Sequence, residues 1–202
     1  MKLYNLRAGA NPRRVRIFLA EKGLTLPMVE VDIVRGEHRT PEFLRLNPLG
    51  KMPVLELDDG TALSESVAIC HYIEALHPTP NLCGEGALEK AQIEMWDRRM
   101  EFDLSIHAIN AFVHGHPFWA GRETQIPALA DLSREKLLER MAWLDGELAG
   151  REFVAGPRYT IADITLQCAL VMAKGIGLRI PDERTHLARW FAAVTARPTA
   201  RA

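Results

Sequence analysis

The feature that most constrains the fold is a change of hydrophobic period near residue 78. Before it, short segments with alternating apolar residues, typical of strands, take turns with segments of helical period. After residue 87 only the helical period is found. A chain of 202 residues with this pattern predicts an α/β domain followed by an all-helical domain.

The first domain, residues 1–78, is predicted to fold as βαβ, a short helix, then ββα. In the second predicted strand, Val29, Val31 and Ile33 fall on one side. The first crossover should be parallel and right-handed, whereas the Asp-Asp-Gly turn predicts an antiparallel hairpin. We therefore expect a small mixed sheet with helices on its faces. The predicted segments are 2–6, 11–23, 26–33, 41–48, 53–66 (both hairpin strands) and 65–78.

Residues 79–86, "TPNLCGEG", have the composition of a linker, and 87–202 form the predicted helical domain. One apolar seam in it consists of residues at spacings of three and four, as a packed helix requires. These are Leu137, Met141, Leu144 and Leu148. The predicted helices are 88–112, 127–150, 160–177 and 185–196.

Bulk properties exclude several classes of function. The formal net charge of -1 provides no field to recruit nucleic acid or an acidic membrane. No apolar run approaches the roughly 20 residues of a membrane span, and the N-terminus lacks a secretory apolar stretch. Cys70, Cys83 and Cys168 are odd in number and lack a CxxC spacing, so we expect reduced thiols and no metal site. These features predict a soluble, cytoplasmic protein.

The segment "AGANPRRVRI" (8–17) predicts a helix start that faces an anion. Asn followed by Pro is the favoured way to begin a helix, so Asn11 is the expected N-cap. Arg13, Arg14 and Arg16 oppose the positive end of the helix dipole unless an anion lies nearby; the alternative for all three is a solvated face. Arg16 is expected on a solvated face.

Three further short motifs are informative. Pro53 after Met52 can open an edge strand without breaking a ladder. Glu65 and Ser66 begin a helix, where free N–H groups and a hydroxyl suit a carboxylate and Glu65 suits an ammonium group; alternatively, Ser64 and Ser66 only cap that helix. In "YTIADITL" (159–166), Thr160 and Asp163 form a predicted capping box with a role in folding alone.

Together, "NPLGKMPVLELDDGTALSES" (47–66) and "YTIADITL" resemble the glutathione transferases, and the resemblance covers essentially the whole chain. It implies a thioredoxin-like N-terminal domain and an all-α C-terminal domain. It also implies a cis bond between Met52 and Pro53, with glutathione bound along the Met52 backbone. Glu65 and Ser66 are implied to hold the γ-glutamyl end of glutathione. Lys51 and His38, with Arg39 as a further candidate, are implied at the glycine carboxylate.

Family members usually place Tyr, Ser or Cys at the end of the first strand, where this chain has Gly9, Ala10 and Asn11. The resemblance there is to beta-class and other bacterial members. Lowering a thiol pKa from about 8.5 to about 6.5 requires roughly 2.7 kcal/mol. A helix start contributes about 0.3–1 kcal/mol and an amide hydrogen bond to a charge about 1.5–3 kcal/mol. Asn11 is therefore a candidate to stabilise the glutathione thiolate; the alternative is a purely capping role.

The helical domain carries the candidates for the second substrate. His107 lies near the position of a catalytic histidine in beta-class enzymes, and Asp97 or Asp103 is implied to reach the γ-glutamyl amine of a neighbouring subunit. The segment 109–123 contains His114, Phe118 and Trp119, which suit an apolar electrophile. The alternative is a loop folded over the helical core.

The resemblance implies a homodimeric enzyme that conjugates glutathione, as a co-substrate, to a small electrophile in detoxification. A glutathione-dependent disulfide reductase or peroxidase is the second hypothesis, because the usual Ser, Tyr or Cys is missing. A non-catalytic binding protein that kept the fold is the third. The presence of Lys51, Met52-Pro53, Glu65 and Ser66 argues against that third hypothesis.

Overall fold

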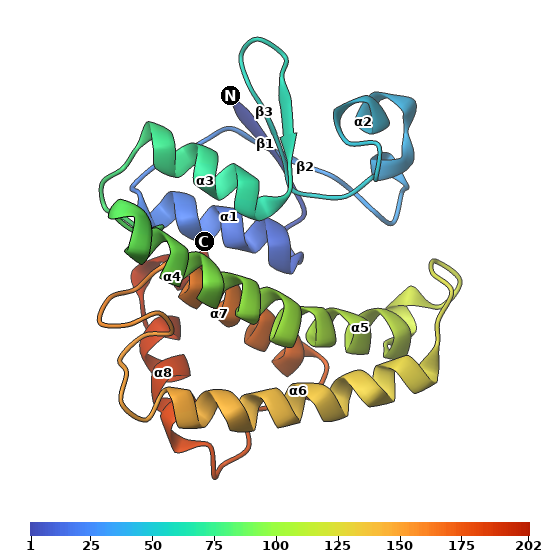
Figure 1. Ribbon diagram of the computed structural model, residues 1–202. Helices are drawn as coiled ribbons and strands as arrows, with labels where there is room; N and C mark the ends of the chain where they lie inside the picture. The colour runs from blue at the N-terminus through green and yellow to red at the C-terminus, as the bar shows by residue number, and fades with distance from the viewer. The chain divides into compact units, whose positions relative to one another are not determined.

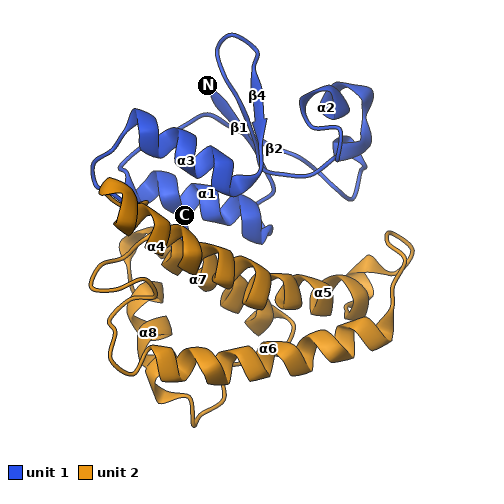
Figure 2. Cartoon of the chain, viewed as in Figure 1, with its two compact units in different colours: residues 1–82, 201–202 blue, residues 83–200 orange.

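A computed structural model describes all residues from 1 to 202 and divides them into two compact units. The first unit comprises residues 1–82 together with 201–202, and the second comprises residues 83–200 (Figure 2). The boundary falls within the segment 79–86 that the sequence assigns to a linker.

The first unit is built on a four-stranded sheet in the order β2-β1-β3-β4. Strand β1 is parallel to β2 and antiparallel to β3, and β3 is antiparallel to β4. The predicted parallel first pair and antiparallel hairpin are thus confirmed. The strands are β1 (Lys2–Asn5), β2 (Met28–Glu30), β3 (Val54–Glu56) and β4 (Ala62–Ser64).

Helices cover both faces of this sheet (Figure 1). Helices α1 (Ala10–Glu21) and α3 (Ser66–Leu76) lie side by side on one face, and α2 (Pro41–Leu46) covers the other. Under α2, Phe43 packs against Val31 and Val54, with its ring edge-on to Tyr4 at 5.8 Å. A short 3₁₀ turn, η1 (Glu37–Arg39), precedes α2.

The second strand is shorter than the predicted segment 26–33. Val31 is buried as expected, but Val29 is 39 % exposed and lies in an edge strand. The Asp32 carboxylate accepts hydrogen bonds from the N–H groups of Val34 and Arg35, at 2.8 and 3.1 Å. This turn, formed by a side chain that competes with the ladder, ends the strand early.

The second unit is helical, as predicted. The predicted helix 88–112 is instead two α-helices joined by a π-helical segment, Met100–Ser105. Helix α7 runs through the core, and all ten residues from 161 to 170 are buried. The helices are α4 (Gly86–Arg99), α5 (Ile106–Gly115), α6 (Pro127–Glu147), α7 (Ile161–Gly175) and α8 (Thr185–Thr195), with 3₁₀ turns η3 (Pro117–Trp119) and η4 (Pro198–Arg201).

The start of α7 confirms the predicted capping box of Thr160 and Asp163. Asp163 is fully buried and accepts N–H bonds from Thr160 (2.9 Å), Val154 (2.9 Å) and the Trp190 indole (2.8 Å). Burial outweighs these donors and raises the pKa of Asp163 to about 6. The predicted seam on α6 is also buried, and none of the helices is both long and apolar enough for a bilayer.

Candidate functional site

The start of α1 differs from its prediction. The helix begins at Ala10 with Gly9 as its N-cap, so the assignment of Asn11 as N-cap is wrong. The chain is compact there: a Cβ on Gly9 would lie 3.0 Å from Pro12 Cδ and 3.2 Å from the Leu6 carbonyl. A glycine therefore fits the cap position, and it provides no side-chain acceptor for the first turn.

This start leaves hydrogen-bond donors available. The Arg13 N–H bonds to the Gly9 carbonyl at 3.0 Å, and Pro12 has no N–H. The N–H groups of Ala10 and Asn11 have no partner within the chain, and neither does the Asn11 carboxamide, which is half-buried. Unsatisfied donors at the positive end of a helix form a site for an anion.

Arg16 holds the loop that precedes α1. The expectation of a solvated side chain is wrong: Arg16 is buried and donates to Asn5 Oδ1 at 2.6 Å and to the Arg7 carbonyl at 2.9 Å. Helical spacing alone predicted a solvated Arg16, but the end of β1 and not solvent faces this side of α1. The guanidinium fixes the path from β1 to the helix start.

The start of α3 is also open. No side chain caps it, so the alternative of a Ser64–Ser66 cap is wrong. Glu65 is the one non-glycine residue with a positive φ, at 67°, a conformation that costs on the order of 1–3 kcal/mol. Its exposed carboxylate has no ionic partner within the chain. Strain combined with an unused charge is typical of a binding site.

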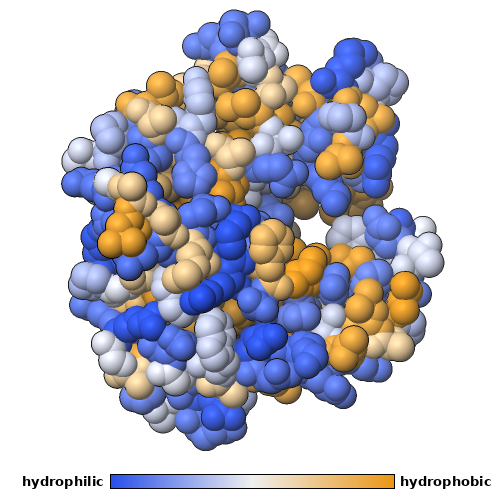
Figure 3. Space-filling view, in the orientation of Figure 1, coloured by the Kyte–Doolittle hydropathy of each residue, from blue (hydrophilic) through white to orange (hydrophobic).

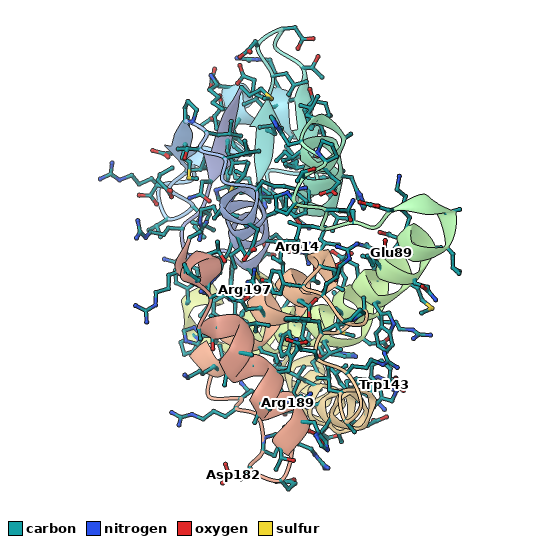
Figure 4. The ribbon with its side chains drawn as sticks, turned by 90° about the vertical axis from the view of Figure 1, so that its left-hand side faces the viewer. Arg14, Glu89, Trp143, Asp182, Arg189 and Arg197 are labelled. Atoms are coloured by element: carbon teal, nitrogen blue, oxygen red, sulfur yellow. The ribbon has the colours of Figure 1, made fainter.

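Ser66 is only 4 % exposed and accepts a hydrogen bond from Arg14 Nη1 at 2.6 Å. Arg14 is 2 % exposed and extends from α1 (Figure 4). This contact joins the starts of α1 and α3. Arg14 was predicted to favour an anion, but its link to Ser66 was missed; the available signal is that Arg14 lies three and four residues before buried Ile17 and Phe18, on the same helix face.

The loop before β3 contains the expected cis bond between Met52 and Pro53. Neither the N–H nor the C=O of Met52 has a hydrogen-bond partner within the chain. A Cβ on Gly50 would lie 2.8 Å from the His38 carbonyl, so η1 packs directly against this loop. His38 and exposed Lys51 therefore belong to one basic loop cluster.

Strand register brings these elements to one end of the sheet. Tyr4 pairs with Val54, and Val54 pairs with Ser64, so the end of β1, the start of β3 and the end of β4 are neighbours. The Arg14–Ser66 bond adds the start of α1. The structure thus gathers Asn11, Met52, Pro53, Glu65 and Ser66, with Lys51 and His38 on the adjoining loop.

The start of α1 has no nucleophile of its own. Between Arg7 and Arg13 the chain carries no hydroxyl or thiol. Tyr4 donates its O–H to Glu56 at 2.8 Å on the face under α2, and Cys70 is fully buried. Any nucleophile that acts here must arrive with a ligand.

Three candidates in the second unit, Asp97, Asp103 and His107, have different outcomes. Asp97 is fully buried and accepts a hydrogen bond from Thr165 Oγ1 at 2.5 Å, so its predicted role toward a neighbouring subunit is wrong. Asp103 pairs with Arg140 at 3.5 Å. Burial and the charge of Arg140 lower the pKa of His107 and so favour its neutral form. Its role at a thiol stays a prediction.

The aromatic segment forms a cluster on one short stretch. The rings of Phe118 and Trp119 lie 5.1 Å apart, and both pack on Phe112 at 6.5 and 5.9 Å. His114 Nδ1 accepts the Ile126 N–H at 3.4 Å. The Trp119 indole N–H is buried without an acceptor, a donor that a ligand can satisfy.

Comparison with known proteins agrees with this architecture. Residues 9–76 match the family model "Glutathione S-transferase, N-terminal domain", and residues 103–198 match "Glutathione S-transferase, C-terminal domain". The chain is 38 % identical over 204 residues to "Glutathione S-transferase 2" of Saccharomyces cerevisiae, covering 98 % of this chain and 87 % of that protein.

Two solved structures are similar over almost the whole chain. Gtt2 from Saccharomyces cerevisiae has a TM-score of 0.94 at 38 % identity, covering 100 % of this chain and 99 % of that one. A glutathione S-transferase domain-containing protein of Marinobacter aquaeolei has a TM-score of 0.94 at 40 % identity, covering 99 % and 100 %. The chain belongs to the glutathione S-transferase family.

Proposed function

We propose that this protein is a glutathione transferase that binds glutathione at the open starts of α1 and α3. The observation that carries this proposal is the start of α1, where two backbone N–H groups and the half-buried Asn11 amide have no partner in the chain. Asn11 donates to the glutathione sulfur and stabilises its thiolate. The nucleophile comes from glutathione and the donors come from the protein.

The remaining site residues bind the rest of the tripeptide. Met52 pairs its free N–H and C=O with the cysteinyl backbone as an added strand, at the turn formed by Pro53. Ser66 binds the γ-glutamyl carboxylate at the start of α3, and Glu65 binds the adjacent ammonium. Lys51, with His38, binds the glycine carboxylate.

In the proposed reaction, the glutathione thiol loses its proton to water and the thiolate attacks an electrophilic carbon. A carbon–sulfur bond forms, and the leaving group departs with the electron pair of its bond. Phe118 and Trp119 provide an apolar wall for the electrophile, and His114 and His107 are the polar groups proposed near it. The lowered pKa of His107 favours its neutral form, which can accept a proton.

A second function has its own support. Because the start of α1 lacks a hydroxyl or thiol, the site suits the attack of the glutathione thiolate on a disulfide or peroxide equally well. Attack on a disulfide forms a mixed disulfide with glutathione and releases a thiolate. A second glutathione then completes the reduction and is itself oxidised.

A homodimer is also proposed. Leu88 and Met95 on α4 are 73 % and 40 % exposed and lie seven residues, about two helical turns, apart. Phe102, in the π-helical segment that follows, is 63 % exposed. Figure 3 shows apolar surface over the stretch where α4 continues into α5. Exposed apolar side chains along this continuous helical stretch suit burial against a second copy.

A cytoplasmic role in detoxification completes the proposal. Cys70, Cys83 and Cys168 are all buried and form no disulfide. Three thiols without a disulfide suit the reducing cytoplasm. Conjugation of apolar electrophiles is the chemistry that such a role requires.

The decisive experiment titrates glutathione with the pure protein while the ultraviolet absorbance of the thiolate is followed. We expect absorbance to appear at pH 7, where free glutathione is mostly protonated. Parallel assays with a model aryl halide and with hydroxyethyl disulfide then separate the two reactions. Absence of binding and of both activities would refute the proposal.

A further inference from the structure

Arg14 is a buried cation whose contact lies at the proposed carboxylate site. It projects from the first turns of α1 (Figure 4), and its Nη1 donates to Ser66 Oγ at 2.6 Å. Arg14 and Ser66 are 2 % and 4 % exposed, so water competes little for either group. The bond links residues 52 positions apart in the sequence.

The bond determines what Ser66 can do next. A serine hydroxyl has one hydrogen and two acceptor lone pairs, whereas a guanidinium can only donate. Because Arg14 occupies a lone pair of Oγ, the hydroxyl hydrogen remains available to an acceptor on another side. Ser66 is thereby prepared as a donor at the start of α3, where the backbone N–H groups also favour an acceptor.

We propose that Arg14 is a positioning residue for the γ-glutamyl carboxylate of glutathione, an inference that rests on the proposed function above. Arg14 acts through Ser66 by keeping that hydroxyl oriented as a donor toward the carboxylate. Its permanent positive charge strengthens the same interaction, since charges attract more strongly where water is excluded.

Arg16 shows what a purely structural arginine looks like in the same helix. Its donors go to Asn5 Oδ1 and to the carbonyl of Arg7, groups that shape the β1–α1 loop. Arg14 instead donates to a side chain at the start of another helix. A structural role for Arg14 predicts lost stability alone, whereas the positioning role predicts a loss that depends on one group of the ligand.

The test compares two ligands by calorimetry. One is S-methylglutathione; the other is the same tripeptide with 4-aminobutyrate in place of the γ-glutamyl residue, which removes only the α-carboxylate. We expect Arg14→Gln to weaken S-methylglutathione binding about 10–30-fold and to leave the weaker binding of the second ligand within about twofold. Arg14→Lys should recover part of the affinity, because it keeps the charge but loses the planar fork.

Kinetics and a double-mutant cycle sharpen the result. Arg14→Gln should raise the KM for glutathione with kcat nearly unchanged at saturation. In a Ser66→Ala background, Arg14→Gln should lower the affinity for S-methylglutathione less than threefold, because the hydroxyl through which Arg14 acts has already been removed. Arg179→Gln, which removes an exposed arginine of the second unit, serves as the matched control.

The outcomes are distinguishable. Wild-type protein that binds S-methylglutathione, together with a folded Arg14→Gln variant of equal affinity, would overturn the positioning role alone. Equal weakening of both ligands would likewise assign Arg14 to structure. If Arg14→Gln does not fold, Arg14→Lys carries the same ligand comparison. Wild-type protein that binds neither ligand would overturn the proposed function itself.

Discussion

The start of α7 differs from the starts of α1 and α3 in how the free N–H groups of the first helical turn are bonded. Every helix begins with N–H groups that lack partners inside the helix. At α7 the chain provides the partners itself, through the Thr160–Asp163 capping box. At α1 and α3 no side chain caps the first turn, although both helices are otherwise well packed.

The difference separates folding from binding. Asp163 has no exposed surface, so nothing from solution can reach it. The α1 start has Asn11 half-buried with an unused amide, and the α3 start has Glu65 in a strained backbone conformation. Such an arrangement lowers stability, and it is useful where a ligand completes the missing hydrogen bonds. The predictions below test this division.

Removing Asp163 from the capping box of α7 should have the largest effect on stability. Asp163→Ala leaves the N–H groups of Thr160, Val154 and the Trp190 indole buried without acceptors. We expect the free energy of unfolding to fall by about 3–5 kcal/mol, measured by urea denaturation. Asp182→Ala, which changes an exposed aspartate, is the control and should stay within about 0.5 kcal/mol. A loss below about 1 kcal/mol for Asp163→Ala would contradict the folding role.

The pH dependence of stability reveals the cost of burying this carboxylate. The folded pKa of Asp163 is about 6, above its ordinary value of 3.8, because burial disfavours the charged form. Between these values the unfolded chain releases the proton first, so the contribution of this group to stability falls as pH rises from about 4 to about 6. Relative to Asp163→Asn, the free energy of unfolding of the wild type should fall by about 2 kcal/mol as pH rises from about 4 to about 6. If the difference in the free energy of unfolding between wild type and Asp163→Asn does not change with pH, the Asp163 carboxyl lies in a more polar environment than the structure shows.

At the open start of α3, binding should suffer more than folding. Ser66→Ala removes the hydroxyl donor, and we expect affinity for glutathione to fall about 10–30-fold by calorimetry. The free energy of unfolding should fall by only about 1 kcal/mol, since one hydrogen bond from Arg14 is lost. Ser64→Ala, in the neighbouring strand β4, is the matched control for affinity. Equal effects of both changes would refute the site.

The sequence predicted the fold far better than it predicted these helix starts. Hydrophobic period predicted the sheet, its mixed topology and the apolar seam of α6, because these depend on many residues acting together. The start of α1 was misplaced at Asn11 because an Asn-Pro pair is a favoured cap in isolation, while Gly9 takes that position in the folded chain. Local preference cannot report that Pro12 and the Leu6 carbonyl both lie close to Gly9, which leaves room for a glycine at the cap position.

The candidate site shows the same limit. Residue types at 51–53 and 65–66 were enough to predict a peptide-binding edge, and the structure places them at one end of the sheet. The burial of Arg14 and Arg16 was not predicted, because each is satisfied by a group distant in sequence or in an irregular loop. A positive φ at Glu65 is likewise invisible in composition, since glycine is the usual residue there.

At the open start of α1, removing the amide should change the thiol more than the affinity. Asn11→Ala should raise the pKa of the bound glutathione thiol by about one unit, because one donor to the thiolate is lost. Asn11→Asp should raise it further through repulsion of like charges. Both shifts are measured by thiolate absorbance against pH. An unchanged thiol pKa in both variants would leave the backbone N–H groups of Ala10 and Asn11 as the only activating donors.

The smallest expected effect tests the strain at Glu65. Glu65→Gly places a glycine at φ 67°, where it has no steric penalty, but glycine also loses more entropy on folding. We expect the free energy of unfolding to rise by about 0.5–1 kcal/mol. Glu65→Ala removes the same carboxylate while keeping the strain, so it should not gain stability. Because both variants lose the partner of the γ-glutamyl ammonium, both should bind glutathione equally weakly. A Glu65→Gly variant that gains stability without losing affinity would show that the site needs neither the strained backbone nor the carboxylate.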